Sequence, residues 1–193
     1  MKVVWPNGES QVFMDADNSP YLTVPNRVGA MCLNQYVFDW WARKVADPKC
    51  HHYLEIGSFD GVMLSLMAEA NPKVEFFAID PFIEAGSTGP GHYGYWYINN
   101  KNLANVTLYF GKSEEHLPKV IETGHKFSAI FIDGDHSYET LKNDLEKSWQ
   151  LLEVGGFMAC HDHHMPDVIR ACQEFSATCP FVEEVGMPVF YKL

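Results

Sequence analysis

The chain has 193 residues, of which 47% are hydrophobic and 14% aromatic, so it carries enough apolar material for one folded domain over residues 1–193. Its formal net charge is −11, from 14 basic and 25 acidic residues. This charge argues against nucleic acid or an anionic membrane surface as the main partner, because both attract a basic face.

Three further features of the sequence narrow the class of protein. No apolar run approaches the roughly 20 residues of a membrane span. The first residues, MKVVWPNGES, turn polar at once and do not resemble a signal peptide. The five cysteines form no CxxC pair, which predicts free thiols in a reducing compartment. We therefore expect a cytoplasmic protein with a small-molecule substrate; whether it forms a homo-oligomer stays open.

The first part of the chain, residues 1–46, is expected to be an arm followed by a helix. Residues 1–30 are rich in turn formers and show little periodicity, so we predict an irregular arm or lid. Apolar residues from Leu33 to Val45 fall at helical spacing, and the sequence DPKC then ends the helix.

From residue 50 onward the pattern alternates between strands and helices. Strands are predicted at 53–57, 74–80, 106–111, 127–133 and 156–162. Helices are predicted at 62–70, 92–103, 112–122, 138–152 and 167–178, and the VGG sequence at 154–156 is expected to end the fourth of them. Residues 181–186 and 188–193 look like a closing hairpin.

This alternation predicts an α/β fold: a Rossmann-like three-layer sandwich around a mainly parallel, seven-stranded sheet with a C-terminal antiparallel hairpin. In such sheets ligands bind beyond the carboxyl ends of the strands. The polar clusters of this sequence fall at those ends, so we expect the functional site there.

The turn after the first of these strands, in YLEIGSFDGVML, has the features of a ligand-binding loop. Gly57 allows a tight turn, and Gly61 lets the next helix pack close to the sheet. The loop lacks both GxGxxG and GK[ST], so a dinucleotide turn and a P-loop are poor fits. Asp80, at the end of the next strand, lies 19 residues after Gly61, a spacing typical of a carboxylate that binds a ribose diol. These features together favour a nucleoside-binding site.

Several segments of the sequence resemble the motifs of a known family. EIGSFDG followed by AIDPF looks like motif I and the acidic second motif of class I S-adenosylmethionine-dependent methyltransferases, and YFGKSEEHLP resembles their third-strand segment. The resemblance covers roughly residues 50–193 and implies S-adenosylmethionine as cofactor. The cofactor-binding residues that it implies are Glu55, Gly57, Ser58, Phe59, Asp60, Gly61, Asp80, Pro81, Lys112, Ser113, Asp133 and His136.

The segment from FIDGDH to CHDHH narrows the resemblance to a metal-associated subgroup. It is similar to macrocin-type O-methyltransferases and cephalosporin-hydroxylase-like proteins, in which an aspartate and an acidic pair bind a divalent metal, usually magnesium. Carried over, the ligands are Asp133 and Asp162, with His161 or His163 as the third. An imidazole ligand suits manganese, iron or zinc better than magnesium, so the identity of the metal stays open.

The chemistry of methyl transfer to a hydroxyl assigns roles to these residues. A metal at Asp133 lowers the pKa of a substrate hydroxyl, and a histidine near neutral pH removes its proton. His136 is the first candidate for this base, with His163 and His164 as competitors. Asp135 is as well explained as the start of the following helix.

We therefore expect a metal-assisted O-methyltransferase that acts on a small hydroxylated molecule such as a sugar or natural-product glycoside. A metal-dependent hydrolase built on DGDH and HDHH, and a non-catalytic nucleoside-binding module, are the alternatives. The aromatic segment at 92–103 and the arm at 1–30 are expected to govern the choice of substrate.

Overall fold

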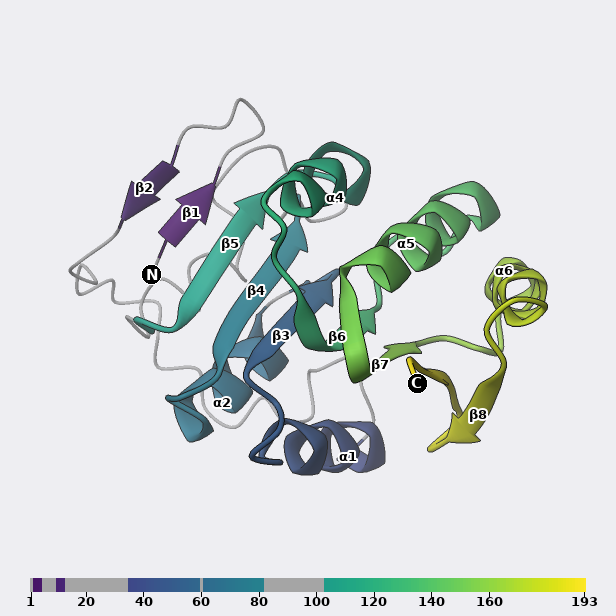
Figure 1. Cartoon of the computed structure of the whole chain (residues 1–193), viewed down its shortest axis with the longest axis horizontal. Coiled ribbons are helices and arrows are strands. Elements are labelled where there is room, and N and C mark those ends of the chain that lie inside the picture. The colour runs from purple at the N-terminus through teal and green to yellow at the C-terminus, as the bar shows by residue number, and fades with distance from the viewer. Residues whose placement is uncertain (1, 5–9, 13–34, 60, 82–102) are drawn as a thin grey trace.

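The computed structural model describes residues 2–4, 10–12, 35–59, 61–81 and 103–193 (Figure 1). Most of the arm predicted over 1–30, nearly all of the aromatic segment at 92–103 and Asp60 lie outside the described residues. Among the described residues, no helix has the length and apolar character needed to cross a bilayer.

The centre of the molecule is a nine-stranded sheet with the order β2-β1-β5-β4-β3-β6-β7-β9-β8. Neighbouring strands from β1 to β7 run parallel, whereas β2, β9 and β8 join through antiparallel pairings. The strands are β1 Lys2–Val4, β2 Ser10–Val12, β3 His52–Ile56, β4 Glu75–Asp80, β5 Val106–Phe110, β6 Phe127–Ile132, β7 Leu152–Cys160, β8 Phe181–Glu184 and β9 Met187–Tyr191. The α/β class and the seven predicted strands, now β3 to β9, are confirmed.

Two additional strands, β1 and β2, lie in the region predicted to be an irregular arm. β1 pairs with β5 in parallel and β2 pairs with β1, so together they extend one edge of the sheet. Each has three residues, which is too short for an alternating pattern to be read from the sequence. These strands form because the edge of β5 has backbone groups that can pair with another strand, and no local sequence pattern indicates them.

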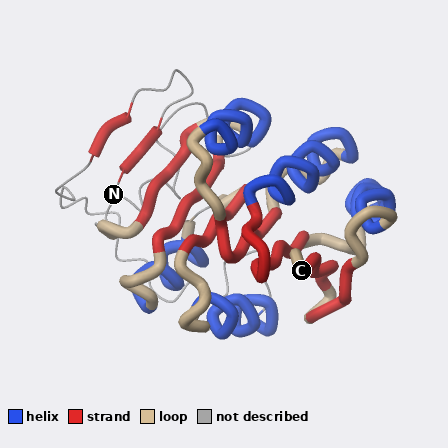
Figure 2. The backbone as a smooth tube through the Cα atoms, viewed as in Figure 1, coloured by secondary structure: helices blue, strands red, loops and turns tan. Residues whose placement is uncertain are grey.

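Helices cover both faces of the sheet, as Figures 1 and 2 show. α1 (Gln35–Val45) and α2 (Val62–Ala70) pack on one face, and α4 (Ser113–Glu122), α5 (Tyr138–Leu151) and α6 (Pro166–Ser176) pack on the other. Side chains of β3 contribute to the hydrophobic cores on both faces of the sheet. Tyr53 faces the core beneath α1, whereas Leu54 and Ile56 face the core beneath α4, α5 and α6.

The two glycines of the VGG sequence do not end α5, contrary to the prediction. The helix ends at Leu151, and β7 begins at the next residue and contains both Gly155 and Gly156. Gly155 has φ +88° and donates its N–H to the carbonyl of Lys192. A Cβ at Gly156 would lie 2.8 Å from the carbonyl oxygen of Ser128. These glycines therefore permit an irregular strand and a close approach of backbones.

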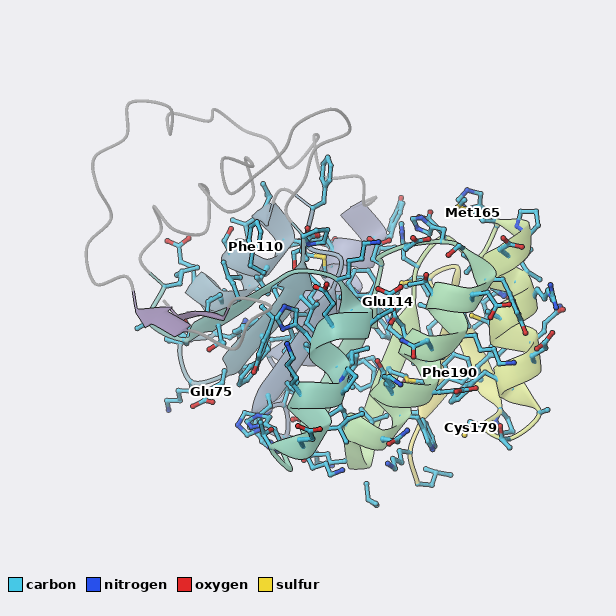
Figure 3. All side chains as sticks on the ribbon, turned by 90° about the horizontal axis from the view of Figure 1, so that it is seen from above. Glu75, Phe110, Glu114, Met165, Cys179 and Phe190 are labelled. Atoms are coloured by element: carbon cyan, nitrogen blue, oxygen red, sulfur yellow. The ribbon has the colours of Figure 1, made fainter. Side chains whose placement is uncertain are left out.

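The carboxyl ends of the parallel strands meet at one edge of the sheet. Ile56 of β3 is in register with Ile79 of β4 and with Ile132 of β6, and Ile132 is in register with Cys160 of β7. The residues that follow these strands must therefore lie side by side. In Figure 3 this edge is marked by Phe110, which ends β5, whereas Glu75, which begins β4, lies at the opposite edge.

Candidate cofactor- and metal-binding site

A cavity of about 380 Å³ opens at the carboxyl edge of the sheet. It lies beyond the ends of β3, β4, β6 and β7, where the fold predicts a ligand. Its lining consists of Ile56, Gly57, Phe59, Ile79, Asp80, Pro81, Lys112, Ser113, Glu114, Asp133, Gly134, Asp135, His136, Thr140, His161 and Asp162.

Gly57 gives the loop after β3 its conformation. Its φ of +85° is in the left-handed region that favours glycine, and its N–H donates to the carbonyl of Ile79. A Cβ at this position would lie 2.1 Å from the carbonyl oxygen of Asp133. Only a residue without a side chain lets the loops after β3 and β6 come this close. The glycine turn predicted at Gly57 is therefore present, and its contact with the loop after β6 is a further role for the missing side chain.

Asp80 holds the same loop from the neighbouring strand. Its Oδ2 accepts hydrogen bonds from the backbone N–H groups of Ser58, at 2.7 Å, and Phe59, at 2.9 Å. Phe59 itself has φ +47°, which is unusual for a residue with a side chain. The buried carboxylate therefore stabilises a strained loop at the cavity wall.

Glu55, which the resemblance assigned to the cofactor site, lies inside the protein and outside the cavity lining. It is 2% exposed, and its Oε2 accepts a hydrogen bond from the hydroxyl of Tyr53 at 2.8 Å. Burial raises the pKa of Glu55 to about 8, although the Tyr53 hydrogen bond acts in the opposite direction. Gly61 and Ser58 are also absent from the lining, although Ser58 contributes its N–H to Asp80.

The amino end of α4 supplies another wall. Lys112 and Ser113, both predicted from the resemblance, line the cavity there. Glu114 and Thr140 line it as well and were missed, because helix surfaces rich in polar residues look like ordinary solvent-exposed faces in a sequence. Figure 3 shows Glu114 at the start of α4, on the same side of the molecule as Phe110.

The ends of β6 and β7 bring two aspartates and two histidines together. Oδ2 of Asp162 lies 2.8 Å from Nε2 of His136 and 3.3 Å from Nδ1 of His161. Oδ1 of Asp133 lies 3.1 Å from Nδ1 of His161 and 3.8 Å from Nε2 of His136. Ligand atoms of Asp133, His136 and Asp162 all lie within 4.8 Å of one another, a spacing that suits a metal ion.

The contacts of His136 are not ordinary hydrogen bonds. Its Nε2 is buried and has no hydrogen-bond partner among the described residues, despite the short distance to Asp162. These close but poorly aligned contacts raise the pKa of His136: the contact with Asp133 contributes most, the charges of both aspartates add to it, and partial burial opposes it.

His161 does form a hydrogen bond within this cluster. A carboxylate only accepts, so Nδ1 of His161 carries the proton and donates it to Oδ1 of Asp133 at 3.1 Å. Burial alone lowers the pKa of His161, but Asp133 and Asp162 outweigh it and leave the pKa raised. Burial likewise opposes the ionisation of Asp133, whereas His136 and His161 hold the pKa of that carboxyl below its usual value.

The remaining predicted residues lie around this cluster. The structure does not bring His163 to the cavity: its ring lies against Phe181 of β8. His164 has an 80% exposed side chain, with its Nδ1 3.7 Å from Asp162. Asp135 accepts the N–H of Ser137 at 2.8 Å just before α5, and it also lines the cavity.

A mainly parallel α/β sheet with a glycine turn, a loop-binding aspartate and this cavity at its carboxyl edge defines the fold of a class I methyltransferase. Solved structures share this fold. The O-methyltransferase from Bacillus cereus in complex with SAH has a TM-score of 0.64 at 14% identity, over 89% of this chain and 94% of that chain. The apo structure of CalS11, TDP-rhamnose 3'-O-methyltransferase, has a TM-score of 0.64 at 18% identity, over 90% of this chain and 88% of that one.

The family follows from the sequence. Residues 54–163, more than half of the chain, match the family model described as methyltransferase domain, and the chain belongs to that family. The resemblance to class I methyltransferases is thereby confirmed. A curated relative, the uncharacterized protein R132 of Acanthamoeba polyphaga mimivirus, is 28% identical over 142 residues. The match spans 65% of this chain and 59% of that relative's length.

Proposed function

We propose that this methyltransferase transfers a methyl group from S-adenosylmethionine to a hydroxyl oxygen of a small polar molecule, with the help of a divalent metal ion. One observation carries the proposal. A single cavity is lined both by the Gly57–Asp80 side, which suits a nucleoside, and by the Asp133–Asp162 side, which suits a cation and a hydroxyl.

The residues on the first side fit the cofactor. The loop that begins with Gly57 brings backbone to the cavity wall without a side chain between them. Asp80 fixes the loop through two N–H groups and lies at the wall with Pro81, where a ribose diol is expected. S-adenosylmethionine supplies the electrophilic methyl group, and the proposed task of these residues is to hold it in one place and orientation.

The residues on the second side fit a divalent cation. Two carboxylates and an imidazole nitrogen lie within 4.8 Å of one another, and that nitrogen is buried without a hydrogen-bond partner among the described residues. Buried polar atoms of this kind normally have a partner, so the cluster is suited to a ligand. By holding a divalent cation there, these residues would lower the pKa of a substrate hydroxyl.

The proton of that hydroxyl needs an acceptor, and two imidazoles, His136 and His161, line the same cavity. His136 is the candidate predicted from the sequence. His161 offers a second choice, because Asp133 fixes its Nδ1–H and thereby leaves Nε2 as the accepting nitrogen. For His161, the hydrogen bond with Asp133 would orient the imidazole and stabilise it once it is charged.

For the acceptor we propose a hydroxylated sugar or a natural-product glycoside. Carbohydrate diols suit a polar wall of aspartates and histidines, which this cavity has on its metal side. The name of CalS11, a TDP-rhamnose 3'-O-methyltransferase of the same fold, supports this class of acceptor.

The test combines binding with transfer. Calorimetry with S-adenosylmethionine and its demethylated product should show that both bind the folded protein. Labelled S-adenosylmethionine, offered with a panel of sugars, glycosides and catechols plus magnesium or manganese, should label a hydroxylated acceptor. A folded protein that binds neither form of the cofactor would refute the proposal. If both forms bind but no panel member is labelled, the sugar and glycoside class is refuted.

A further inference from the structure

We infer that Asp133, His136 and Asp162 form a mixed nitrogen–oxygen metal site that takes a first-row transition cation, such as manganese(II) or cobalt(II), in preference to magnesium. The inference rests on the proposed function, since it concerns the metal of the same site. It assigns His136 to the metal, which leaves His161 as the acceptor of the substrate proton.

The first argument is the position of Nε2 of His136. It lies 2.8 Å from Oδ2 of Asp162, close enough for a strong hydrogen bond, yet it is buried and has no hydrogen-bond partner among the described residues. The contact is an ion pair when His136 is protonated, and its separation also fits two ligands of one cation. Metal–ligand bonds of about 2.1 Å at right angles separate neighbouring ligand atoms by about 3 Å.

The second argument is that His161 has another partner. Its Nδ1 is hydrogen-bonded to Oδ1 of Asp133, in the manner of a residue that orients a ligating carboxylate. His163 lies against Phe181 and is not among the cavity-lining residues. The fourth histidine of this region, His164, has an 80% exposed side chain. Nε2 of His163 is also buried without a hydrogen-bond partner among the described residues, but His163 does not line the cavity, so His136 is the one whose buried nitrogen is available to the cation.

The third argument is the backbone of Asp162. Its φ of +53° lies in the left-handed region, which costs a residue with a side chain of the order of 1 kcal/mol. Hydrogen bonds from His161 N–H to Ile132 and from Met165 N–H to the carbonyl of Asp162 hold this conformation. Strain of this kind is typical of residues whose side chain must point at a site.

The preference for a transition cation follows from the donor atoms. Magnesium takes oxygen ligands and keeps much of its water, so an imidazole is a poor ligand for it. Manganese, iron and cobalt accept imidazole and carboxylate together, with affinity that rises along this series. A site with two carboxylates and one imidazole therefore favours these ions over magnesium.

The test is a set of metal titrations on the chelator-treated protein. Calorimetry should show manganese(II) binding at least ten-fold more tightly than magnesium, and cobalt(II) more tightly than manganese. Pulsed electron paramagnetic resonance of the manganese-loaded protein should show coupling to an imidazole nitrogen. Magnesium bound as tightly as manganese, or a manganese spectrum without nitrogen coupling, would overturn the inference.

Three variants identify the ligating histidine. His136→Asp makes the site all-oxygen, so it should lose the nitrogen coupling and shift the preference at least ten-fold toward magnesium. His161→Asn should keep the coupling, as should the control His164→Asn, which changes an exposed imidazole near Asp162. Coupling that survives in His136→Asp and disappears in His161→Asn would contradict the assignment.

A measurement of cofactor binding distinguishes this inference from the proposed function. Calorimetry with S-adenosylmethionine on the same samples tests the cofactor site, because Asp80 and the Gly57 loop lie on the other side of the cavity. Metal selectivity without cofactor binding would refute the methyl-transfer proposal alone, whereas cofactor binding with no transition-metal preference would refute the inference alone.

Discussion

The carboxylate of Asp80 accepts the backbone N–H of Ser58, 22 residues earlier in the chain, at 2.7 Å. The N–H of the next residue, Phe59, donates to the same oxygen at 2.9 Å. The aspartate that the family resemblance places at the ribose is therefore also the anchor of the loop after β3. We propose that binding of the cofactor and order in this loop are coupled through the Asp80 side chain.

We predict that Asp80→Asn weakens binding of S-adenosylmethionine by roughly 10- to 100-fold, since it replaces charge-assisted hydrogen bonds worth about 1.5–3 kcal/mol with weaker ones. Calorimetry measures the change. Asp135→Asn is the matched control, because Asp135 also lines the cavity but its carboxylate is engaged with the N–H of Ser137. Equal affinity in wild type and Asp80→Asn would remove Asp80 from the cofactor site.

A second prediction concerns Gly57, where a side chain has no room. Gly57→Ala places a Cβ 2.1 Å from the carbonyl of Asp133 on a backbone with φ +85°, so we expect a loss of roughly 3 kcal/mol or more in the free energy of unfolding. Urea denaturation measures it. Gly134→Ala is the control: the atoms nearest to its Cβ belong to Ile56, with the side chain at 3.4 Å and the backbone carbonyl oxygen at 3.7 Å, so the change should alter stability by less than about 1 kcal/mol.

Much of the fold was predictable because its signals are local. The buried strand β6 is a mainly apolar run, with Ser128 as its polar member, that ends just before Asp133, and β4 is a similar run that ends at Asp80. The alternation of such strands with amphipathic helices leaves few other topologies. The positions of Gly57, Asp80 and Asp133 at one edge of the sheet then follow from the fold.

The parts that were missed depend on contacts distant in sequence. Gly155 and Gly156 looked like a helix terminator, yet β7 uses them beside Lys192 and Ser128, which lie far along the chain. The division of roles among the histidines was equally hidden. Four of them follow the ends of β6 and β7 in the sequence, and they look alike there. Only side-chain geometry shows that His161 donates to Asp133, whereas Nε2 of His136 makes no well-aligned hydrogen bond among the described residues.

A third prediction concerns stability against pH. Asp144 of α5 is 1% exposed, and burial raises its pKa to about 7, although hydrogen bonds from Ser113 and Asn143 act in the opposite direction. The folded pKa is higher than the unfolded value of 3.8, so the folded state binds the proton more tightly. Its contribution to stability is therefore present below about pH 4 and is lost as the pH rises toward 7, with a slope of up to about 1.4 kcal/mol per pH unit.

Asp144→Asn removes this titration. Urea denaturation between pH 4.5 and 8 should show that stability falls less steeply with pH in the variant than in wild type. The buried Glu55, whose pKa is raised to about 8, contributes a fall of the same sign in both proteins and so cancels in the comparison. Parallel curves for the two proteins would show that Asp144 does not titrate in this range.

The last prediction is that removal of metal impairs methyl transfer but leaves cofactor binding nearly unchanged. With a strong chelator present, S-adenosylmethionine should still bind within about three-fold of its normal affinity, because Asp80 and the Gly57 loop contain no proposed metal ligand. Methyl transfer to an acceptor should fall by roughly 100-fold or more, since the hydroxyl loses the cation that lowers its pKa. Added manganese should restore it in wild type but not in Asp133→Asn, because that variant lacks a ligand of the site. Transfer that continues unchanged in the chelator would show that the imidazoles and carboxylates act without a metal.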